Sequence, residues 1–170
     1  MHRDLKPENI MFKEKDKLDS LVIVDFGLAE IEDELPYLFN KCGTPGYVAP
    51  EIANYQEKSE NGYSGLCDVF SAGIIFYTLL FYKSLFIGKK FNEVLKLNKE
   101  CNINFLDKSF QDLPFDTLDL LQKMLEKNPS NRISAEDALK HSYFKNEKEK
   151  RKTQKQQLGS IQQLFYCKQF

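Results

Sequence analysis

The stretch HRDLKPEN, residues 2–9, brings together the side chains that transfer of a phosphoryl group would need. Asp4 can act as a general base that orients an attacking hydroxyl, and Lys6, two positions later, can reach a transferring phosphate. Asn9 offers an oxygen ligand of the hard kind that Mg²⁺ prefers. The spacing therefore predicts phosphoryl-transfer chemistry close to the first residue of the sequence.

The residues that follow predict a β-hairpin. Apolar runs at 10–12 and 21–24 flank the polar stretch KEKDKLDS, which is the pattern of two strands joined by a solvated turn. We expect the strands to be antiparallel, with Ile10 paired near Val24 and Phe12 near Val22.

This register would bring Asn9 close to Asp25, although the two lie sixteen positions apart in the sequence. Asp25 is the first residue of the tripeptide DFG, and its carboxylate can supply a second oxygen ligand. The convergence of both side chains at one end of the hairpin predicts a magnesium site there.

After the hairpin the sequence predicts a long ordered loop and then helices, so that the chain as a whole is mainly α. Residues 28–48 contain Pro and Gly but few periodic apolar positions, which indicates a loop. The run 66–81 is apolar nearly all round and predicts a helix buried on most faces. Amphipathic segments follow at Phe91–Leu97, Phe115–Leu125 and Ala135–Phe144; Pro114 marks the start of the second, and Ser134 with Asp137 forms a capping box before the third.

Composition excludes several classes of protein. Apolar residues make up 42% of the 170, which is enough to bury a core, and a net charge of -1 gives no reason to expect nucleic acid as a partner. No run of about eighteen apolar residues occurs, so no membrane partner is expected. The cysteines lack C-x-x-C spacing, and we expect free thiols in a soluble cytoplasmic protein: Cys42, Cys67, Cys101 and Cys167.

Three motifs in order carry a resemblance to protein kinases. HRDLKPEN at 2–9, DFG at 25–27 and APE at 49–51 are similar to the catalytic-loop, magnesium-loop and activation-segment signatures of that superfamily. Lys6 together with GTPGYVAPE resembles serine/threonine kinases, and CGTPGYVAPE is most similar to the calmodulin-dependent group. The resemblance implies the mostly helical C-terminal lobe, a small hairpin plus helices, as a partial kinase domain over 1–144.

The resemblance also implies cofactors, a substrate and roles. These are ATP and Mg²⁺, and a protein substrate with Ser or Thr hydroxyls. Thr44 would contact Asp4 and Lys6 and favour hydroxyl substrates of that type. The implied catalytic residues are Asp4 and Lys6, the metal ligands Asn9 and Asp25, the substrate and activation-segment residues Gly43, Thr44 and Tyr47, and the structural residues His2, Arg3, Phe26, Gly27, Glu51, Asp68 and Arg132.

Two of these structural residues imply long-range contacts. Glu51 resembles the partner of Arg132 in an ion pair that ties the end of the loop to the helical core. Asp68, inside the apolar helix, resembles a carboxylate that accepts backbone amide hydrogens from the 2–9 segment. The alternative for Asp68 is a carboxylate near a helix end that faces solvent.

The sequence also departs from the kinase pattern. It has no G-x-G-x-x-G loop, no V-A-I-K lysine and no preceding helix with a partner glutamate, all of which normally come before the catalytic loop. We expect a fragment of a full kinase that is inactive alone. Two alternatives stay open, namely a non-catalytic binding module and an unrelated magnesium hydrolase that uses Asp4 and Asp25 but not Thr44 or Glu51.

Regulation of the loop is a further expectation. Kinases in which Arg precedes the catalytic Asp, as Arg3 does here, commonly neutralise it with a phosphorylated loop residue. No Ser or Thr occurs between Asp25 and Cys42, so we expect no Ser/Thr phosphorylation switch there, with Tyr37 as the remaining candidate. An acidic run would offset Arg3 instead, or would simply be solvated: Glu30, Glu32, Asp33 and Glu34.

The last residues, 145–170, form a basic tail that could be helical. Apolar residues behind its charged run lie on one helical face: Leu158, Ile161, Leu164 and Phe165. Such a segment could bind a calmodulin-like regulator or fold over a substrate groove, and the alternative is a frayed solvated extension.

Overall fold

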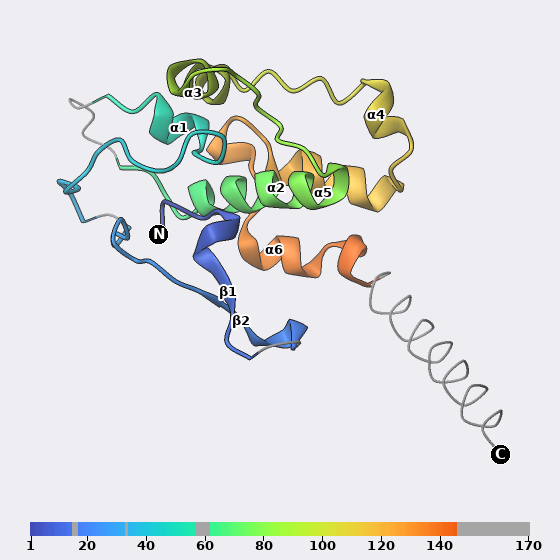
Figure 1. Ribbon diagram of the computed structural model, residues 1–170, viewed down its shortest axis with the longest axis horizontal. Coiled ribbons are helices and arrows are strands. Elements are labelled where there is room, and N and C mark those ends of the chain that lie inside the picture. The colour runs from blue at the N-terminus through green and yellow to red at the C-terminus, as the bar shows by residue number, and fades with distance from the viewer. Residues whose placement is uncertain (15–16, 33, 57–61, 146–170) are drawn as a thin grey trace.

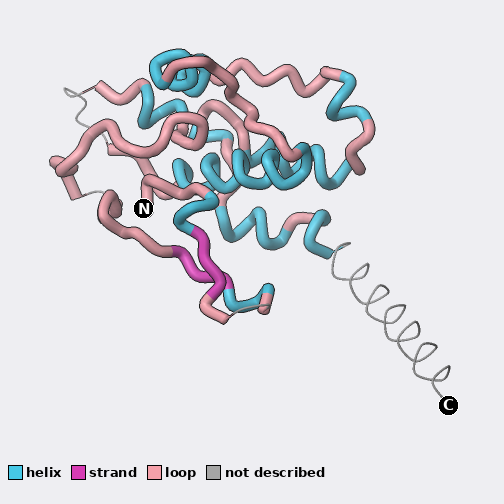
Figure 2. Tube along the Cα trace, viewed as in Figure 1, coloured by secondary structure: helices cyan, strands magenta, loops and turns pink. Residues whose placement is uncertain are grey.

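The computed structural model describes residues 1–14, 17–32, 34–56 and 62–145. Within them, helices α1 to α6, a helical stretch at 142–145 and a two-stranded antiparallel sheet confirm the mainly α prediction (Figures 1 and 2). Single 3₁₀ turns occur at Pro7–Asn9, Leu18–Ser20 and Pro129–Asn131. The elements are β1 (Ile10–Phe12), β2 (Leu21–Ile23), α1 (Pro50–Ala53), α2 (Leu66–Phe81), α3 (Phe91–Glu100), α4 (Lys108–Gln111), α5 (Phe115–Met124) and α6 (Ala135–Lys140).

The hairpin forms, but its register differs by one residue from the prediction. Ile10 lies opposite Ile23, not Val24, and Phe12 lies opposite Leu21, not Val22. Short strands that are largely exposed on both faces do not fix a register by their apolar pattern, because neither face must be buried.

The turn between the strands sets the register instead. The backbone N–H of Lys13 donates to the carbonyl of Ser20 at 2.9 Å, and the hydroxyl of Ser20 donates to the carbonyl of Lys17 at 2.7 Å. At the other end the N–H of Val24 donates to the carbonyl of Asn9 at 3.0 Å. Asn9 therefore lies across from Val24, one position before Asp25.

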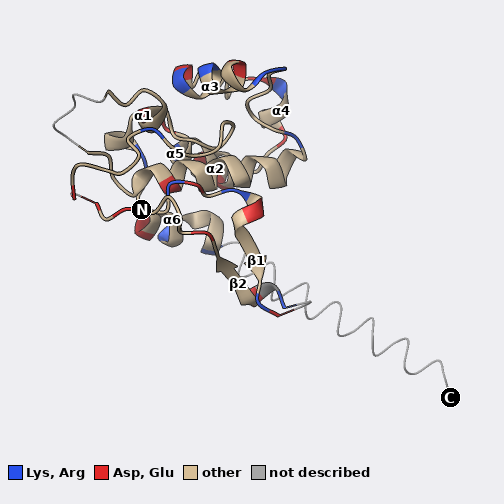
Figure 3. Cartoon of the chain, turned by 60° about the vertical axis from the view of Figure 1, so that its left-hand side comes forward, with Lys and Arg blue, Asp and Glu red and all other residues tan. Residues whose placement is uncertain are grey.

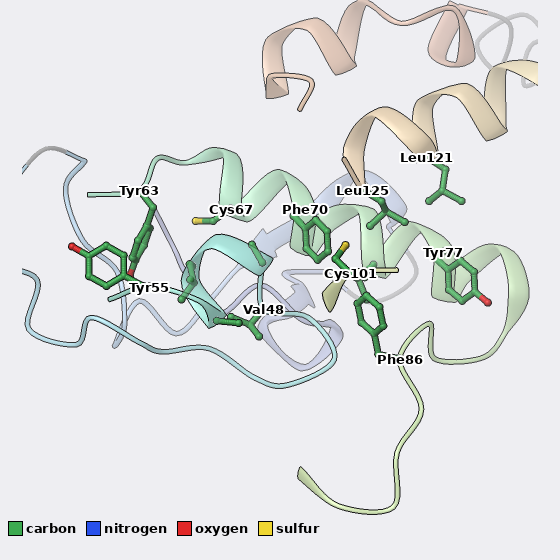
Figure 4. Packing of buried hydrophobic residues seen from close by; sticks show 14 of the residues in the cluster. Val48, Tyr55, Tyr63, Cys67, Phe70, Tyr77, Phe86, Cys101, Leu121 and Leu125 are labelled. Atoms are coloured by element: carbon green, nitrogen blue, oxygen red, sulfur yellow. The ribbon is translucent and has the colours of Figure 1, made fainter. Parts of the chain in front are cut away.

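Helix α2 has the predicted bounds and forms the centre of the molecule, with α5 packed against it (Figure 1). Phe70 and Ile74 are almost completely buried within one apolar cluster (Figure 4). Burying a side chain of this size stabilises the fold by about 1.5–3 kcal/mol. A Cβ on Gly73 would meet a methyl carbon of Leu125 at 2.9 Å, so Gly at this position allows the close approach of α2 to the end of α5.

The amphipathic helices form with shifted ends. Helix α3 runs three residues past Leu97, and α5 ends one residue before Leu125. Helix α6 starts as predicted, since the hydroxyl of Ser134 accepts the N–H of Asp137 at 3.0 Å. It ends at Lys140, because His141 leaves helical geometry with φ -61° and ψ 149°. Residues 142–145 are helical again, so the segment predicted to run to Phe144 is interrupted at His141.

The remaining segments agree with the sequence analysis. The described residues between 28 and 48 contain no helix or strand, as predicted. Cys42, Cys67 and Cys101 are free thiols, and Cys167 lies outside the described residues. In the part of the chain that the structure describes, every helix is too short or too polar to cross a membrane.

Candidate active site

The 2–9 segment is anchored to α2 by one carboxylate. Asp68 accepts the backbone N–H of His2 at 2.7 Å and that of Arg3 at 2.8 Å, so the predicted contact is present. Arg3 has φ 68°, a left-handed conformation that costs free energy in a residue with a side chain. The two hydrogen bonds to Asp68 hold the backbone in this conformation, one residue before Asp4.

Asp4, Lys6 and Thr44 form a closed set of hydrogen bonds, as the resemblance to kinases implied. The Thr44 hydroxyl donates to Oδ1 of Asp4 at 2.7 Å, and the Lys6 ammonium lies 2.8 Å from both Oδ2 of Asp4 and Oγ1 of Thr44. Thr44 comes from the 43–48 loop, so these bonds join two segments that are distant in sequence. The carboxylate is thus held between a cation and a hydroxyl.

This set also determines the charge state of the carboxylate. Burial disfavours the charged form of Asp4, but hydrogen bonds from Lys6 and Thr44 outweigh that effect and hold the pKa of Asp4 below its usual value of 3.8. The hydrogen bond to Asp4 in turn raises the pKa of Lys6 above its usual value of 10.5. The pair is therefore ionised at neutral pH.

The two predicted metal ligands lie at neighbouring positions across the end of the hairpin. The side-chain amide of Asn9 is buried and its Nδ2 donates to the carbonyl of Asp4 at 2.9 Å, so Oδ1 is the atom that it keeps for a ligand. Asp25 is exposed, with φ 63°, and its Oδ1 accepts the N–H of Gly27 at 3.3 Å. Phe26, between them in the DFG tripeptide, is 63% exposed and its ring contacts His2 edge-on.

This donor set suits Mg²⁺ bound together with a nucleotide. Among the described residues no group of three or more His, Cys, Asp or Glu side chains gathers as a metal site. Mg²⁺ commonly takes one or two protein oxygens and completes its octahedron with phosphate oxygens and water. One carboxylate from Asp25 and one amide oxygen from Asn9 fit that requirement.

The 43–48 loop needs glycine where it passes the 2–9 segment. Gly43 has φ 96°, and a Cβ there would lie 2.8 Å from the carbonyl oxygen of Arg3. The next turn is closed by hydrogen bonds to the carbonyl of Thr44 from the N–H groups of Tyr47 at 3.0 Å and Val48 at 3.1 Å. Only glycine lets Thr44 approach Asp4 this closely.

The predicted ion pair is also present at the end of this region. The guanidinium of Arg132 donates to both carboxylate oxygens of Glu51, at 2.6 and 2.9 Å, and to the carbonyl of Leu66 at 2.8 Å. The Arg132 side chain is completely buried, and its guanidinium lies over the ring of Phe70. It therefore joins α1, α2 and the segment before α6.

The side chain of Arg3 is buried under the long loop. It donates to the carbonyls of Leu28 at 2.6 Å and Phe39 at 2.9 Å and to the hydroxyl of Tyr63 at 2.8 Å. Glu30 lies 3.4 Å from the guanidinium, so one member of the acidic run offsets Arg3 as expected.

The rest of that run and Tyr37 behave differently. Glu32 accepts the N–H of Gly65 at 3.0 Å, and Asp33 lies outside the described residues. Tyr37, the candidate for modification, is 3% exposed and its hydroxyl donates to the carbonyl of Tyr63 at 3.1 Å. In this conformation the Tyr37 hydroxyl is not accessible to another enzyme.

Sequence reasoning missed two side chains that hold the 43–48 loop. Asn98 on α3 bonds the backbone of Gly46 and Val48, and Ser71 on α2 donates to the carbonyl of Tyr47 at 2.9 Å. The sequence offered one signal for Asn98, because an amide stands there on the apolar face of α3, four positions after Val94.

Comparisons with known proteins agree with the geometry. The family profile described as "Protein kinase domain" matches residues 1–144. "Calcium-dependent protein kinase 3" of Plasmodium yoelii yoelii is 36% identical over 148 residues, 86% of this chain and 26% of that protein. "Calcium/calmodulin-dependent protein kinase type I" of Schizosaccharomyces pombe is 34% identical over 167 residues, 97% of this chain and 48% of that protein. "Myosin light chain kinase A" of Dictyostelium discoideum is 35% identical over 145 residues, 85% of this chain and 48% of that protein. The chain thus spans between about a quarter and a half of the length of these relatives.

Proposed function

The chain belongs to the protein kinase family and resembles its serine/threonine members of the calmodulin-dependent kind, and on that premise we propose that it contributes the catalytic half of a serine/threonine kinase. The reaction is transfer of the γ-phosphoryl group of Mg-ATP to Ser or Thr hydroxyls of a protein substrate. The observation that carries the proposal is the closed set of Asp4, Lys6 and Thr44, with 2.7–2.8 Å between partners.

Asp4 serves as the group that orients the substrate hydroxyl and accepts its proton. Its carboxylate is ionised because the hydrogen bonds from Lys6 and Thr44 lower the pKa of Asp4. Lys6, already beside Asp4, places a positive charge where the phosphoryl group is transferred. These residues position and stabilise, which is most of what phosphoryl transfer asks of a protein.

Asn9 and Asp25 hold magnesium in this proposal. When bound, Mg²⁺ neutralises charge on the phosphate oxygens. The amide of Asn9 is fixed for this task by its hydrogen bond to the carbonyl of Asp4, which couples the metal ligand to the base. Asp25 stands on left-handed backbone at the end of β2 with its carboxylate open to solvent, and so can be reached by a nucleotide.

A protein substrate is supported by the surroundings of the 43–48 loop. A cavity of about 410 Å³ lies beside this loop and is lined by Pro45, Ile74 and Phe86 among others. Its walls are largely apolar side chains and backbone, which suits a side chain of a peptide substrate.

The 170 residues alone should not turn over ATP. The sequence lacks the G-x-G-x-x-G loop and the V-A-I-K lysine that clamp the phosphates in this family. Without them the phosphates of Mg-ATP would be held by Asn9, Asp25 and Lys6 but by no glycine-rich loop and no V-A-I-K lysine, and we expect weak binding. A non-catalytic binding module is the competing function, and it predicts no transfer under any condition.

An isotope-transfer assay separates these functions. The chain is tested alone and after fusion behind the N-terminal segment that precedes the matching region of the Schizosaccharomyces pombe relative; this fusion is called the joined chain. We expect the joined chain to phosphorylate Ser and Thr peptides but not Tyr peptides, and Asp25→Ala to abolish transfer. Lys145→Ala, an exposed residue outside the site, is the matched control and should leave the rate within twofold.

Absence of transfer by a folded joined chain that binds ATP would favour the binding module. Robust transfer by the 170 residues alone would contradict the requirement for the missing phosphate clamp.

The calmodulin-like regulator stays a prediction, since residues 146–170 lie outside the described part of the chain. The similarity to a relative named for calcium and calmodulin extends over 97% of this chain, and so includes most of this tail. A peptide of residues 145–170 should change its electrophoretic mobility when calcium and calmodulin are added, and unchanged mobility would contradict the hypothesis.

A further inference from the structure

Asn98 is a completely buried amide on α3 whose two polar atoms both bond the backbone of the 43–48 loop. Its Oδ1 accepts the N–H of Gly46 at 2.8 Å, and its Nδ2 donates to the carbonyl of Val48 at 2.8 Å. Nothing of this side chain is exposed. A buried polar side chain is costly unless it is hydrogen-bonded, so these two bonds are what make Asn tolerable at this position.

No other residue type of this size can make both bonds. One amide supplies an acceptor and a donor side by side, which matches one N–H and one C=O two residues apart on the loop. Aspartate would keep the acceptor but face the carbonyl of Val48 with a second acceptor. Leucine would leave both backbone groups of the loop without partners.

The loop is thereby fixed from two helices at three consecutive residues. The Asn98 side chain is hydrogen-bonded to the backbone of Gly46 and Val48. The hydroxyl of Ser71 on α2 donates to the carbonyl of Tyr47, which lies between them, at 2.9 Å. Gly46 has φ 96°, a conformation that the loop must hold to present its N–H to Asn98. The backbone of the loop has little freedom to shift while both side chains are in place.

The fixed loop backbone is connected by hydrogen bonds, through Thr44, to Asp4, the proposed base. The N–H groups of Tyr47 and Val48 close the turn on the carbonyl of Thr44, and the hydroxyl of Thr44 donates to Asp4. A movement of the loop away from α3 would therefore open this turn and draw Thr44 from the carboxylate.

We propose that Asn98 is a positioning residue for phosphoryl transfer, acting through the 43–48 loop on Thr44 and so on Asp4. It touches neither substrate nor metal; it fixes the loop that supplies the hydroxyl beside the base and the wall of the substrate cavity. The inference has a structural half, that Asn98 holds the 43–48 loop, and a catalytic half, that this positioning supports phosphoryl transfer. The catalytic half rests on the proposed function, whereas the structural half is independent of it.

The structural half is tested by amide hydrogen exchange, followed by NMR on the 170-residue chain. In Asn98→Asp the carboxylate keeps an acceptor for the Gly46 amide but faces the carbonyl of Val48 with a second acceptor, so we expect the amides of Tyr47 and Val48, which close the turn on Thr44, to exchange at least about tenfold faster. The amides of α5 should keep their rates. Asn92→Asp, the same change at an exposed position of α3, is the matched control and should alter nothing in the loop.

Two more variants keep the test decisive if a buried charge prevents folding. Asn98→Leu removes both hydrogen bonds without adding a charge, and Ser71→Ala removes the bond from α2; both should accelerate exchange in the loop. Leu120→Val, a change at a buried position of α5, lowers the stability of the whole fold and should not accelerate exchange of the Gly46 amide more than that of other amides. Unchanged exchange of the Gly46 amide in a folded Asn98→Leu variant, which lacks the acceptor for that amide, would overturn the proposal.

The catalytic half is tested on the joined chain. We expect Asn98→Leu to lower kcat/KM for a Ser peptide by about 10- to 100-fold, as a small misplacement of catalytic groups does, with KM for ATP within twofold. Equal losses in Asn98→Leu and in Leu120→Val would show a merely structural role. A joined chain with no wild-type transfer would overturn the proposed function and this half with it, while hydrogen exchange would still decide whether Asn98 holds the loop.

Discussion

On one side of the candidate active site, the backbone segments that carry Asp4 and Thr44 are hydrogen-bonded to side chains of two helices, Asp68 of α2 and Asn98 of α3. On the other side, Asp25 and the neighbouring Phe26 follow the second strand of the hairpin. This hairpin projects from the helical body (Figure 1). Asp4 is buried and hydrogen-bonded on both oxygens, whereas Phe26 is 63% exposed and Asp25 is open to solvent.

The same contrast extends to the elements. Helix α2 carries one charged residue, while α3 presents charges of both signs on its surface (Figure 3). The hairpin is neither a buried apolar element like α2 nor an element with a charged surface like α3. Several of its large apolar side chains are about half exposed: Met11, Phe12, Leu21 and Ile23. The helices thus organise Asp4, the proposed base, and the 43–48 loop, and they do not contact the exposed side chains of the hairpin next to the proposed metal ligand Asp25 to the same extent.

The largest expected effect on stability lies on the organised side. Arg132→Ala should lower the free energy of unfolding by about 3–5 kcal/mol, because Glu51 would be left as a largely buried charge without its partner. Urea unfolding of the 170-residue chain measures this. Lys140→Ala, which breaks an exposed ion pair with Glu136, is the control and should cost less than about 1 kcal/mol.

A pair of apolar substitutions tests the contrast itself. Leu121→Ala in α5 removes a fully buried side chain and should cost about 2–5 kcal/mol. Leu21→Thr in β2 changes a side chain that is 54% exposed and should stay within about 0.5 kcal/mol. Comparable losses in the two variants, measured by urea unfolding, would mean that the hairpin is as integral to the fold as α5.

The anchor of the 2–9 segment should have an intermediate effect. Asp68→Asn replaces one of two carboxylate acceptors by a donor and leaves a buried N–H of His2 or Arg3 unpaired. We expect a loss of about 1–3 kcal/mol in the free energy of unfolding. Full stability of Asp68→Asn would indicate that the left-handed backbone at Arg3 needs no such anchor.

The smallest expected effect concerns pH. Because the folded state lowers the pKa of Asp4 below 3.8, its carboxylate contributes stability that is present above that value and is lost as the pH falls through the lower folded value. Asp4→Asn should therefore lose less stability than the wild type on acidification below about pH 4. Parallel acid-unfolding curves for the two proteins would contradict this assignment of the pKa shift.

Much of the site could be predicted because its residues stand in contiguous motifs. The resemblance of HRDLKPEN and GTPGYVAPE to kinase motifs implies that Asp4, Lys6 and Thr44 meet, and it extends to the distant contacts of Asp68 and Arg132. Each of these residues is recognisable by its type and its neighbours in sequence.

What could not be predicted depends on tertiary detail. The role of Asn98 needs the distance between α3 and the 43–48 loop, which no local pattern contains. The hairpin register follows from the turn around Ser20, not from the apolar residues of the strands. The break after α6 depends on the backbone geometry of His141, since the amphipathic pattern continues and residues 142–145 are helical again.

The proposed role of Asp4 as the base is tested most directly by Asp4→Asn in the joined chain, with kcat and the Kd of ATP measured on the same preparation. We predict that kcat for a Ser peptide falls by about 10² to 10⁴-fold, as loss of a general base does, while the Kd of ATP stays within twofold. The amide preserves the shape of the side chain beside Lys6 and Thr44, so a folded protein is expected. A kcat within threefold of the wild type, in a joined chain that transfers phosphate to Ser peptides, would contradict the assignment of Asp4 as the base.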